Sequence, residues 1–490
     1  MRAAVDTDVL IVGAGPVGLF LANECARRGL RFRIIEANAT QSEHSKALAI
    51  FPRTLEIFDM AGLVGPFLEA ANRVTSVAVI SHQNTLARIH FAPAESPYAF
   101  IAMVPQDITE RLLVTQLNRA GAAVEYRTKF ISATDEEDCM SVTLDREGVP
   151  LKLRACFVVG CDGAHSTVRR LLGLPFEGRE YEALFMLADV ETNDALPGDE
   201  MQLCPHESGP LAIFPMSGTR RRIVATVEKS DGEVPSLALV QRLLCMRAPH
   251  GIEATRLNWS SYFRIHHREV ARLRVGRTFI AGDAAHIHSP FGGQGMNTGL
   301  QDVWNLVWKL DLAVRGHASE TLLDSYTAER RPVIKAVVRT TDLLTKAMAT
   351  PSKFAQTLRD ALIPRLSHLP AFQHAFVQRL SGLGIAYRHS PIIEGSGERY
   401  FDEWQRGGRG IGSHFVLLTN SDFSSGDPQR QFLESVADLV DVRRANFEDT
   451  VLVRPDGYVA CSARRGNAAH ELSSLRSLLQ RQTAPGNVPG

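Results

Sequence analysis

The chain has 490 residues, which corresponds to about three domains of roughly 150 residues each. Its 54 Lys and Arg residues balance its 54 Asp and Glu residues, so the formal net charge is zero and a nucleic-acid partner is not expected. With 44% hydrophobic and 22% charged residues, no membrane-length apolar run and no secretory signal, we expect a globular cytoplasmic protein without a membrane partner.

The first motif of chemical interest is a glycine-rich turn near the start of the chain. The apolar run Val9–Val12 predicts a strand buried on both faces of a parallel sheet. In the following turn, Gly13 permits a sharp bend, Gly15 lets the backbone approach a pyrophosphate, and Gly18 lets the next helix pack on the strand. A second apolar run ends at Glu36, where a carboxylate can accept hydrogen bonds from an adenosine ribose. This segment predicts a dinucleotide site and does not distinguish NAD from FAD.

Two distant segments each end an apolar strand in a pair formed by glycine and aspartate. One strand leads to Asp162-Gly163, which is followed by a short capped helix. Another leads to Gly282-Asp283 and then to a loop with glycines at positions 292, 293 and 295. A carboxylate at a strand end is suited to hold a sugar hydroxyl, and such glycines bring backbone N–H groups against a planar ligand. A helix over Met296–Val314 follows, with an apolar stripe for core packing and the positive end of its dipole toward the loop.

These motifs together resemble one enzyme family. The glycine turn with its later acid, VVGCDGAHSTVRR and GRTFIAGDAAHIHSPFGGQGMNTGLQD are similar to segments of the FAD-dependent aromatic hydroxylases, the class A flavoprotein monooxygenases with the p-hydroxybenzoate hydroxylase fold. The phenol hydroxylase and polyketide hydroxylase branches are nearer still, and the resemblance is clear over about residues 6–340.

The resemblance implies a fold and a division into domains. The fold is α/β, with a Rossmann-like FAD-binding domain, an inserted β-sheet substrate domain and a C-terminal thioredoxin-like domain. The implied boundaries are 1–73, 105–180 and 273–345 for FAD binding, 74–104 and 181–272 for the substrate domain, 346–395 for a helical linker, and 396–490 for the thioredoxin-like domain.

The resemblance also implies the residues that contact the cofactor. Asp283 would bond the ribitol chain of FAD, and Gln106 would touch the linker of the flavin. Lys46 stands where the family usually has arginine, so it keeps the charge and loses the planar, bidentate fork. The full implied set is Gly13, Gly15, Pro16, Val17, Gly18, Glu36, Ala37, Lys46, Gln106, Asp162, Gly163, Gly282, Asp283, Pro290, Gly293, Gly295, Met296 and Asn297.

We expect the sheet that faces the substrate to be built from the strand-like runs in residues 74–104 and 181–272. Phe214, Met216 and the backbone of Pro290 are the candidate substrate contacts. No catalytic side chain is assigned; the weak candidates are the Pro290 carbonyl, His206 and His267, and for each histidine a structural role is favoured. The histidines lack the spacing of metal ligands, so no metal site is expected.

The C-terminal hundred residues contain short strand-like runs and the segment VLVRPDGYVAC, in which Pro455-Asp456-Gly457 predicts a turn. No C-x-x-C occurs there, which excludes thiol redox chemistry for this unit. A structural or dimer-forming role is favoured, so the protein is either a monomer or a homodimer through this domain.

The implied activity is hydroxylation of a phenolic or polycyclic aromatic substrate with FAD, O2 and a transient NADPH or NADH, through a C4a-hydroperoxyflavin. One dinucleotide fingerprint is present, which agrees with a nicotinamide that visits and leaves. Baeyer–Villiger or dehydrogenase chemistry on the same scaffold remains an alternative. A flavin-bound module that shelters a reactive intermediate is another.

Overall fold

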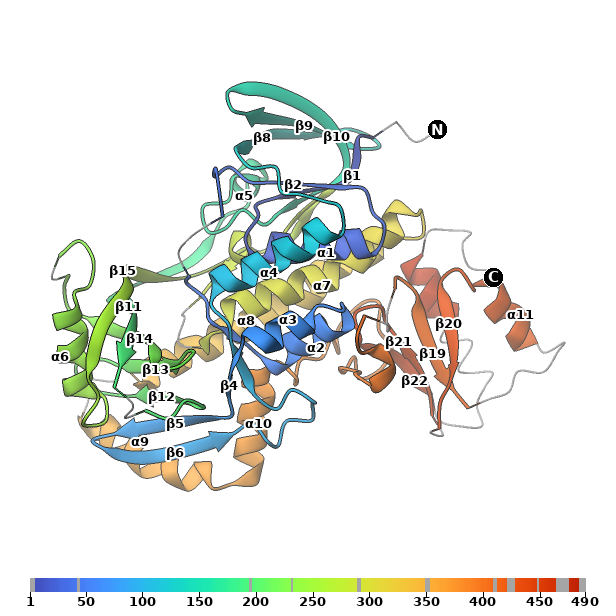
Figure 1. Cartoon of the computed structure of the whole chain (residues 1–490). Helices are drawn as coiled ribbons and strands as arrows, with labels where there is room; N and C mark the ends of the chain where they lie inside the picture. The colour runs from blue at the N-terminus through green and yellow to red at the C-terminus, as the bar shows by residue number, and fades with distance from the viewer. Residues whose placement is uncertain are drawn as a thin grey trace.

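The computed structural model describes residues 5–41, 45–193, 196–230, 232–288, 292–348, 353–408, 412–420, 428–446, 449–463 and 476–483. Pro290, a candidate for both cofactor and substrate contact, lies outside the described residues. Figure 1 shows three regions: a central α/β region that contains the N-terminal strands, a sheet-rich region on one side of it, and a small C-terminal sheet on the other.

The central region is built on a seven-stranded sheet whose strands come from widely separated segments. They are β1 (Thr7–Val12), β2 (Phe32–Ile35), β8 (Thr128–Asp135), β9 (Met140–Arg146), β10 (Val149–Gly160), β16 (Arg274–Val275) and β17 (Thr278–Ile280). The main path is β16-β17-β10-β1-β2, and β1 runs parallel to both β10 and β2. Every residue of β1 is buried, as its continuous apolar run predicts. The three motif-bearing strands β1, β10 and β17 therefore end at one edge of one sheet.

Helices pack on this sheet and on one another. They are α1 (Pro16–Arg27), α2 (Pro52–Met60), α3 (Val64–Ala70), α4 (Gln106–Arg119), α5 (Thr167–Leu171), α7 (Gly295–Val314) and α8 (Glu320–Met348). Helix α1 contacts both α4 and α7 (Figure 1). The predicted apolar stripe of α7 packs into the main core, and every residue of α7 from Met296 to Leu312 is buried. A helix enclosed on all sides must also bury its polar residues.

The sheet-rich region is an eight-stranded sheet in the order β18-β15-β11-β14-β13-β12-β5-β6. Its strands are β5 (Ser76–Ser81), β6 (Asn84–His90), β11 (Glu177–Thr192), β12 (Glu200–Cys204), β13 (Leu211–Pro215), β14 (Arg220–Val227), β15 (Ala254–Glu269) and β18 (His286–Ile287). Apolar side chains alternate between two clusters, one on each face. Phe214 and Met216 belong to one cluster, and Ile213 to the other, which also contains residues of α6 (Leu237–Arg247).

Shorter elements complete the sheet-rich region. Strands β3 (Ala49–Ile50), β4 (Asn72–Val74) and β7 (Ile101–Met103) form a three-stranded sheet between the two larger ones. Helices α9 (Lys353–Ser367) and α10 (Pro370–Ser381) contact β6 (Figure 1). Val377 of α10 joins the cluster that contains Phe214, so α10 covers that face of the sheet.

The loop after β17 connects the two large sheets directly. A short 3-10 turn, η1 (Gly282–Ala284), follows β17, and the chain then enters β18. Strand β18 pairs with the end of β15, with Arg268 opposite Ile287 and Glu269 opposite His286. The Gly282-Asp283 motif is therefore held between a strand of the central sheet and the edge of the eight-stranded sheet.

The C-terminal unit is a four-stranded sheet in the order β20-β19-β21-β22. Its elements are β19 (Phe415–Thr419), α11 (Pro428–Ser435), β20 (Val440–Arg444), β21 (Thr450–Val453) and β22 (Val459–Ala463), preceded by the turn η3 (Glu403–Gln405). β19 is parallel to β20 and antiparallel to β21, and β21 is antiparallel to β22. The predicted turn between β21 and β22 is present, with Gly457 at a φ of +74°.

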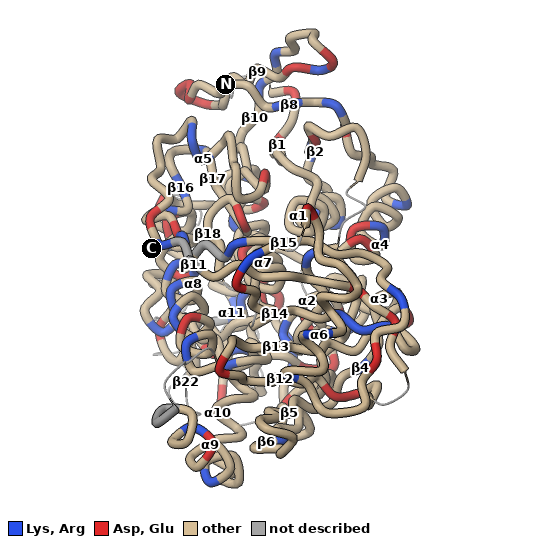
Figure 2. The backbone as a smooth tube through the Cα atoms, turned by 90° about the vertical axis from the view of Figure 1, so that its left-hand side faces the viewer, with Lys and Arg blue, Asp and Glu red and all other residues tan. Residues whose placement is uncertain are grey.

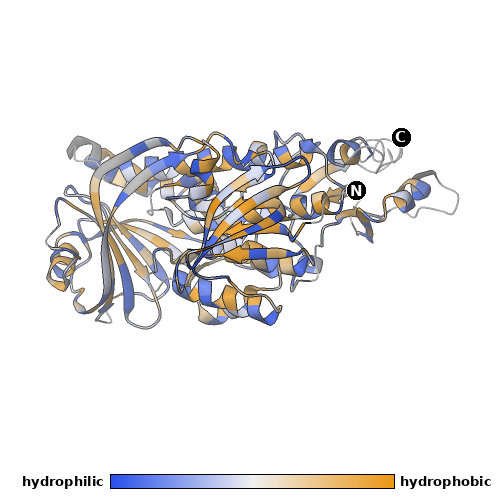
Figure 3. Ribbon diagram, turned by 90° about the horizontal axis from the view of Figure 1, so that it is seen from above, coloured by the Kyte–Doolittle hydropathy of each residue, from blue (hydrophilic) through white to orange (hydrophobic). Residues whose placement is uncertain are grey.

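The distribution of charge and hydropathy follows this layout. Acidic and basic residues are interspersed along the backbone in Figure 2, consistent with the balanced composition. Figure 3 shows apolar residues concentrated in the strands and helices in the middle of the molecule. None of the helices in the described part of the chain is long and apolar enough to cross a membrane.

Two buried carboxylates on α7 and α8 have unusual electrostatics. Burial by itself raises the pKa of Glu329, but Arg454 and Lys309 outweigh burial and hold that pKa well below its ordinary value. Burial likewise opposes ionisation of Asp302, whose pKa Arg330 and His286 keep below the usual range. Both carboxylates are therefore ionised in the folded state, and both favour folding wherever they remain charged.

We expect the free energy of unfolding to fall as the pH drops below about 4.3, the ordinary value for an unfolded Glu, because the unfolded chain then takes up protons that folded Glu329 and Asp302 do not. Glu329→Gln should make this fall at low pH shallower and cost about 3 kcal/mol at neutral pH, since it leaves Lys309 buried without its anion and Arg454 with only one of its two. Urea unfolding at a series of pH values measures both effects. Glu434→Gln removes a carboxylate from an exposed ion pair and should change the free energy of unfolding little. If the free energy of unfolding of Glu329→Gln fell at low pH as steeply as that of the wild type, the assignment would be contradicted.

Candidate functional site

The glycines of the first turn meet different surroundings. Gly13 has a φ of +103°, and a Cβ there would lie 2.5 Å from the carbonyl oxygen of Cys161. A Cβ on Gly18 would lie 2.0 Å from the carbonyl oxygen of Gly13, which is the close helix–strand contact that the motif predicts. A Cβ on Gly15 would meet no described atom within 4 Å. Packing thus requires glycine at positions 13 and 18, whereas the space at Gly15 opens onto a cavity.

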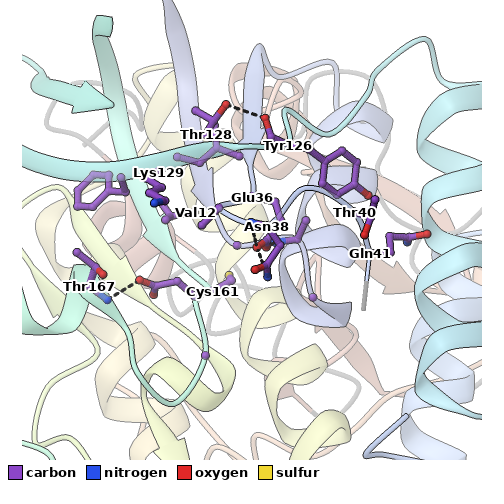
Figure 4. Close-up of a pocket in the computed structure, with 18 of the residues that line it drawn as sticks. Val12, Glu36, Asn38, Thr40, Gln41, Tyr126, Thr128, Lys129, Cys161 and Thr167 are labelled. Atoms are coloured by element: carbon purple, nitrogen blue, oxygen red, sulfur yellow. Dashed lines mark hydrogen bonds between the residues drawn. The ribbon is translucent and has the colours of Figure 1, made fainter. Parts of the chain in front are cut away.

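This cavity has a volume of about 580 Å³ and lies beyond the carboxyl ends of β1, β2 and β10. Tyr126, Thr128 and Lys129 line it as well, and Figure 4 shows them with Glu36 and Asn38. The cavity brings together eight of the residues predicted to bind the cofactor: Gly13, Gly15, Glu36, Ala37, Lys46, Gln106, Asp162 and Gly163.

Glu36 shapes the turn as well as the cavity. Its Oε2 accepts a hydrogen bond from the Ala14 backbone N–H at 3.0 Å. Its Oε1 accepts from the backbone N–H and the side-chain Nδ2 of Asn38, at 2.9 and 2.8 Å. The carboxylate at the end of β2 therefore ties the glycine turn to the next loop, and Oε2 keeps a lone pair for a ribose hydroxyl.

Gln106 is fixed by contacts on both ends of its amide. Its Oε1 accepts from the Ala47 backbone N–H at 3.1 Å, and its Nε2 donates to Glu110 Oε1 at 2.9 Å. One N–H of the amide remains for a ligand in the cavity. Glu110 lines the same cavity. Burial raises the pKa of Glu110 to about 7, with Asp107 and Glu36 adding to the increase and Gln106 opposing it.

Asp162 uses its carboxylate to begin α5. Its Oδ1 accepts from the Ser166 hydroxyl at 2.5 Å, and its Oδ2 accepts from the backbone N–H groups of Thr167 and Val168 at 2.7 and 3.1 Å. What Asp162 and Gly163 present to the cavity is thus mainly backbone, and Gly163 has a φ of +73° with open space beside it. Arg169 of α5 then donates to the carbonyl oxygens of Ala164 and Ala284, which joins this turn to the loop after β17.

Asp283 projects from that loop with an exposed side chain, although Gly282 and Ala284 on either side are buried. The surrounding protein raises the pKa of Asp283 by desolvation, while His286 and Lys46 act in the opposite direction. An exposed carboxylate in a largely buried setting, within electrostatic reach of a lysine from the first cavity, fits a polar ligand that extends from one motif to the other.

The glycine loop before α7 packs on β3. A Cβ on Gly293, whose φ is +61°, would lie 3.3 Å from the Phe51 ring and 3.4 Å from Ala49. Asn297 donates to the carbonyl oxygens of Ala49 and Gly293 at 2.8 and 3.1 Å and accepts from the Phe51 N–H at 2.9 Å. The Asn297 side chain therefore fixes the loop against β3. Met296 is buried in the main core, so its backbone is what remains for a ligand.

The weak catalytic candidates are placed far apart. His206 lies in the connection between β12 and β13, and its Nδ1 is hydrogen-bonded to the Ser208 hydroxyl, which Arg247 of α6 also contacts. His206 therefore lies near α6, on the face of the sheet opposite Phe214 and Met216. His267 is buried near the end of β15, next to the residue that pairs with Ile287 of β18. Burial, with a smaller contribution from Lys346, lowers the pKa of His267. Within the described ranges, no three His, Cys, Asp or Glu side chains are grouped as metal ligands.

The comparisons with known proteins agree with this geometry. A family model described as "FAD binding domain" matches residues 6–341. 6-Methylpretetramide 4-monooxygenase of Streptomyces rimosus is 31% identical, over 98% of this chain and 95% of the relative. Pentachlorophenol 4-monooxygenase of Sphingobium chlorophenolicum is 30% identical, over 79% and 72%. The solved structure of OxyS anhydrotetracycline hydroxylase from Streptomyces rimosus has a TM-score of 0.80 and 29% identity, over 98% and 99%.

A Rossmann-like sheet with a glycine turn, an acid after β2 and a second carboxylate loop at the same edge defines an FAD-binding oxidoreductase. The chain belongs to the FAD-dependent aromatic hydroxylases, the class A flavoprotein monooxygenases. It is therefore an enzyme that uses FAD to oxygenate aromatic substrates.

Several residues that shape the site escaped the sequence analysis. Glu110 lies one helical turn after Gln106, and that spacing could have indicated the pair. Asp302, Asn305 and Lys309 recur at helical spacing along α7, which forms a polar stripe beside the apolar one. Only a helix enclosed on every side needs partners for such a stripe, and enclosure is not visible in a single sequence.

The glycine contacts give a matched pair of variants. Gly15→Val should leave the stability of the FAD-free protein unchanged and weaken FAD binding about tenfold to a hundredfold, because its side chain enters only the cavity. Gly18→Val should lower the free energy of unfolding by about 3 kcal/mol, because its side chain meets the Gly13 carbonyl. FAD titration and urea unfolding of the apoprotein measure the two effects. Equal losses of stability in both variants would show that Gly15 is also a packing position.

The raised pKa of Glu110 predicts a pH dependence of FAD affinity. Above pH 7 the ionised carboxylate repels the negative pyrophosphate, so the dissociation constant should rise several-fold between pH 6 and 8. Lys46 and Lys129 also line the cavity and partly offset the negative charge of its carboxylates. Glu110→Gln, which can still accept from Gln106, should bind FAD with little change over that range. Asp107→Asn on the same helix should retain the wild-type profile; a profile lost in Asp107→Asn and kept in Glu110→Gln would reverse the assignment.

Proposed function

We propose that the chain hydroxylates a phenolic ring of a multi-ring aromatic substrate, with O2 and NADPH or NADH as co-substrates. The chemistry that FAD supplies when bound is transfer of one oxygen atom of O2 to the ring, with the nicotinamide as reductant. The protein then has to hold the cofactor, place the ring beside it and exclude water.

The residues present fit FAD, and we assign them as follows. The N-terminus of α1, with the open backbone at Gly15, receives the pyrophosphate, and Glu36 accepts from the adenosine ribose. Asp283 accepts from the ribitol hydroxyls, and the N-terminus of α7 favours negative charge on the flavin ring. The wide space beside Gly15 and the exposed carboxylate of Asp283 are the observations that support this placement.

The substrate assignment rests on one observation: the glycine loop is in direct contact with an apolar cluster. Gly293 packs on Ala49 and Phe51, which share a cluster with Phe214 and Met216 on the flavin-facing side of the eight-stranded sheet. Phe185 and Phe263 stack on the same side, with ring centres 5.6 Å apart. Gln294 of the loop donates to the carbonyl oxygen of Leu380 in α10 at 2.6 Å, so loop, sheet and helix enclose one apolar region.

A wide apolar wall of aromatic and methionine side chains favours a large planar substrate, because such side chains gain most by stacking against a flat apolar surface. The comparisons point the same way. Two relatives that match nearly the whole chain are named for 6-methylpretetramide and anhydrotetracycline, and a relative named for pentachlorophenol matches 79% of it.

His267 is the retained candidate for assisting phenol deprotonation. It lies on β15 beside the pairing with β18, close to the loop that carries Asp283. Its lowered pKa favours the neutral imidazole, which can accept a proton.

We also infer that the C-terminal unit is thioredoxin-like, within the boundaries proposed from the sequence. Its sheet places the second strand beside the first in parallel, and the third and fourth follow antiparallel on the other side. The composition of the sheets supports the interrupted division of the chain, since β5 and β6 precede residue 104 and the next strand of their sheet begins at Glu177.

The test is anaerobic reduction of bound flavin by NADPH and by NADH, in the presence of single-ring and multi-ring phenols. We expect a multi-ring phenol to accelerate reduction about tenfold or more, and the product formed in air to carry one atom of oxygen-18 from labelled O2. Phe214→Ala should lower kcat/KM for that substrate by about tenfold, and Ile213→Val on the opposite face of β13 should not. Formation of peroxide alone with every phenol, or equal acceleration by single-ring phenols, would contradict the proposal.

A further inference from the structure

Six fully buried charged side chains connect α7, α8 and the C-terminal unit. Three are cations and three are anions, so the cluster is neutral as a whole, and each side chain has 0% exposure. They are Asp302, Lys309, Glu329, Arg330, Arg454 and Asp456. Ionic clusters of this size are costly to bury unless each member is well paired, so their pairing determines what the cluster does.

The first half of the cluster attaches the turn between β21 and β22. Arg454 holds Glu329 of α8 through two bonds, of 2.5 and 2.9 Å, and also holds Asp456 at 2.6 Å. Lys309 of α7 donates to Glu329 at 2.8 Å. The backbone carbonyl of Asp456 accepts from Trp304 at 3.0 Å. The C-terminal turn is therefore inserted between α7 and α8, beside which its sheet lies in Figure 1.

The second half attaches the Asp283 loop. Asp302 Oδ2 accepts from the Gly282 backbone N–H at 3.2 Å and from His286 Nε2 at 2.7 Å, so one carboxylate holds the loop on both sides of Asp283. Its Oδ1 accepts from Arg330 Nε at 2.8 Å.

Two contacts join the halves. Glu329 and Arg330 are consecutive residues of α8, so the C-terminal turn that binds Glu329 also restrains Arg330. Arg330 further donates to the Tyr387 hydroxyl at 3.0 Å, and the Tyr387 ring lies 4.4 Å, centre to centre, from the ring of Tyr458 in the C-terminal turn. An unbroken series of contacts thus leads from the C-terminal turn to the loop that carries Asp283.

We propose that the Arg454–Tyr458 turn of the C-terminal unit helps to hold the flavin site in the shape that binds FAD. It fixes Glu329 and Arg330, Arg330 fixes Asp302, and Asp302 holds the Gly282–His286 loop in the shape that receives the cofactor. Asp302, Arg330 and Tyr387 are positioning residues; none of them needs to touch FAD. The proposal rests on the assignment of the Asp283 loop to FAD made above.

The mildest test removes a single hydroxyl. Tyr387→Phe keeps the ring on Tyr458 and loses the acceptor for Arg330, and Arg330→Lys keeps the charge but cannot hold Asp302, the Thr298 carbonyl and Tyr387 together. Thr419→Val is the matched control, because it removes an equally buried hydroxyl from the C-terminal sheet away from the turn. All three changes are made in the full chain.

Two measurements separate positioning from general stability. Hydrogen–deuterium exchange of the FAD-free protein reports on residues 280–287, and titration with FAD gives the dissociation constant. Tyr387→Phe should accelerate exchange in 280–287 and raise the dissociation constant about fivefold to tenfold, with a larger effect in Arg330→Lys. Thr419→Val should lower the unfolding temperature without changing either quantity.

The proposal is overturned if Tyr387→Phe shows wild-type exchange in 280–287 and wild-type FAD affinity, or if Thr419→Val changes both as much as Tyr387→Phe does. If Arg330→Lys does not fold, Tyr387→Phe decides alone. If the wild-type chain does not bind FAD, the proposed function fails, and exchange in the apoprotein still decides whether the turn positions the loop.

Discussion

The close contact of α1 and α7 above the carboxyl edge of the central sheet is the constraint on which the rest of the structure depends. Val17 of α1 sits between Gly282 and Gly299, where added Cβ atoms would lie 3.0 and 2.6 Å from its Cγ2. Together with the contact of Gly18 on Gly13, this brings two helix N-termini to the ends of parallel strands. Each terminus contributes free N–H groups and a positive dipole, so a single packing arrangement creates two places that favour negative charge.

The parts of the fold that the sequence predicted are those set by local patterns. The apolar run of β1, the glycines at 13, 15 and 18 and the stripe along α7 depend on neighbours within a few residues, and they predicted their elements correctly. The thioredoxin-like topology and the domain boundaries were inferred by resemblance, and they stay proposals. What the sequence could not show are contacts between distant segments. Nothing near Asp302 indicates that its partners are Gly282, His286 and Arg330.

The same limitation applied to residues with predicted roles. Asn297 was in the set expected to contact the cofactor, and its side chain bonds three backbone groups, which belong to Ala49 of β3, Phe51 and Gly293. Asp162 was in the same set, and its carboxylate accepts from the first backbone N–H groups of α5. In both cases the polar side-chain atoms are already paired with other groups of the protein. A site made of turns and helix ends has many free N–H and C=O groups, which side chains of the motif must pair before any ligand arrives.

The pairing of β18 with β15 has a consequence for how such an enzyme can acquire new substrates. The short loop between β17 and β18 joins the two large sheets, and three strands (β15, β11 and β14) separate β18 from β13 in the eight-stranded sheet. Replacements on β13 can therefore reshape the apolar wall while the cofactor loop keeps its anchor. Replacements at the end of β15 alter both at once. With the substrate wall and the cofactor loop assigned as proposed, substrate range and cofactor geometry are separable on the β13 side of the sheet and coupled at the end of β15, and sequence drift among relatives should be freer on the β13 side.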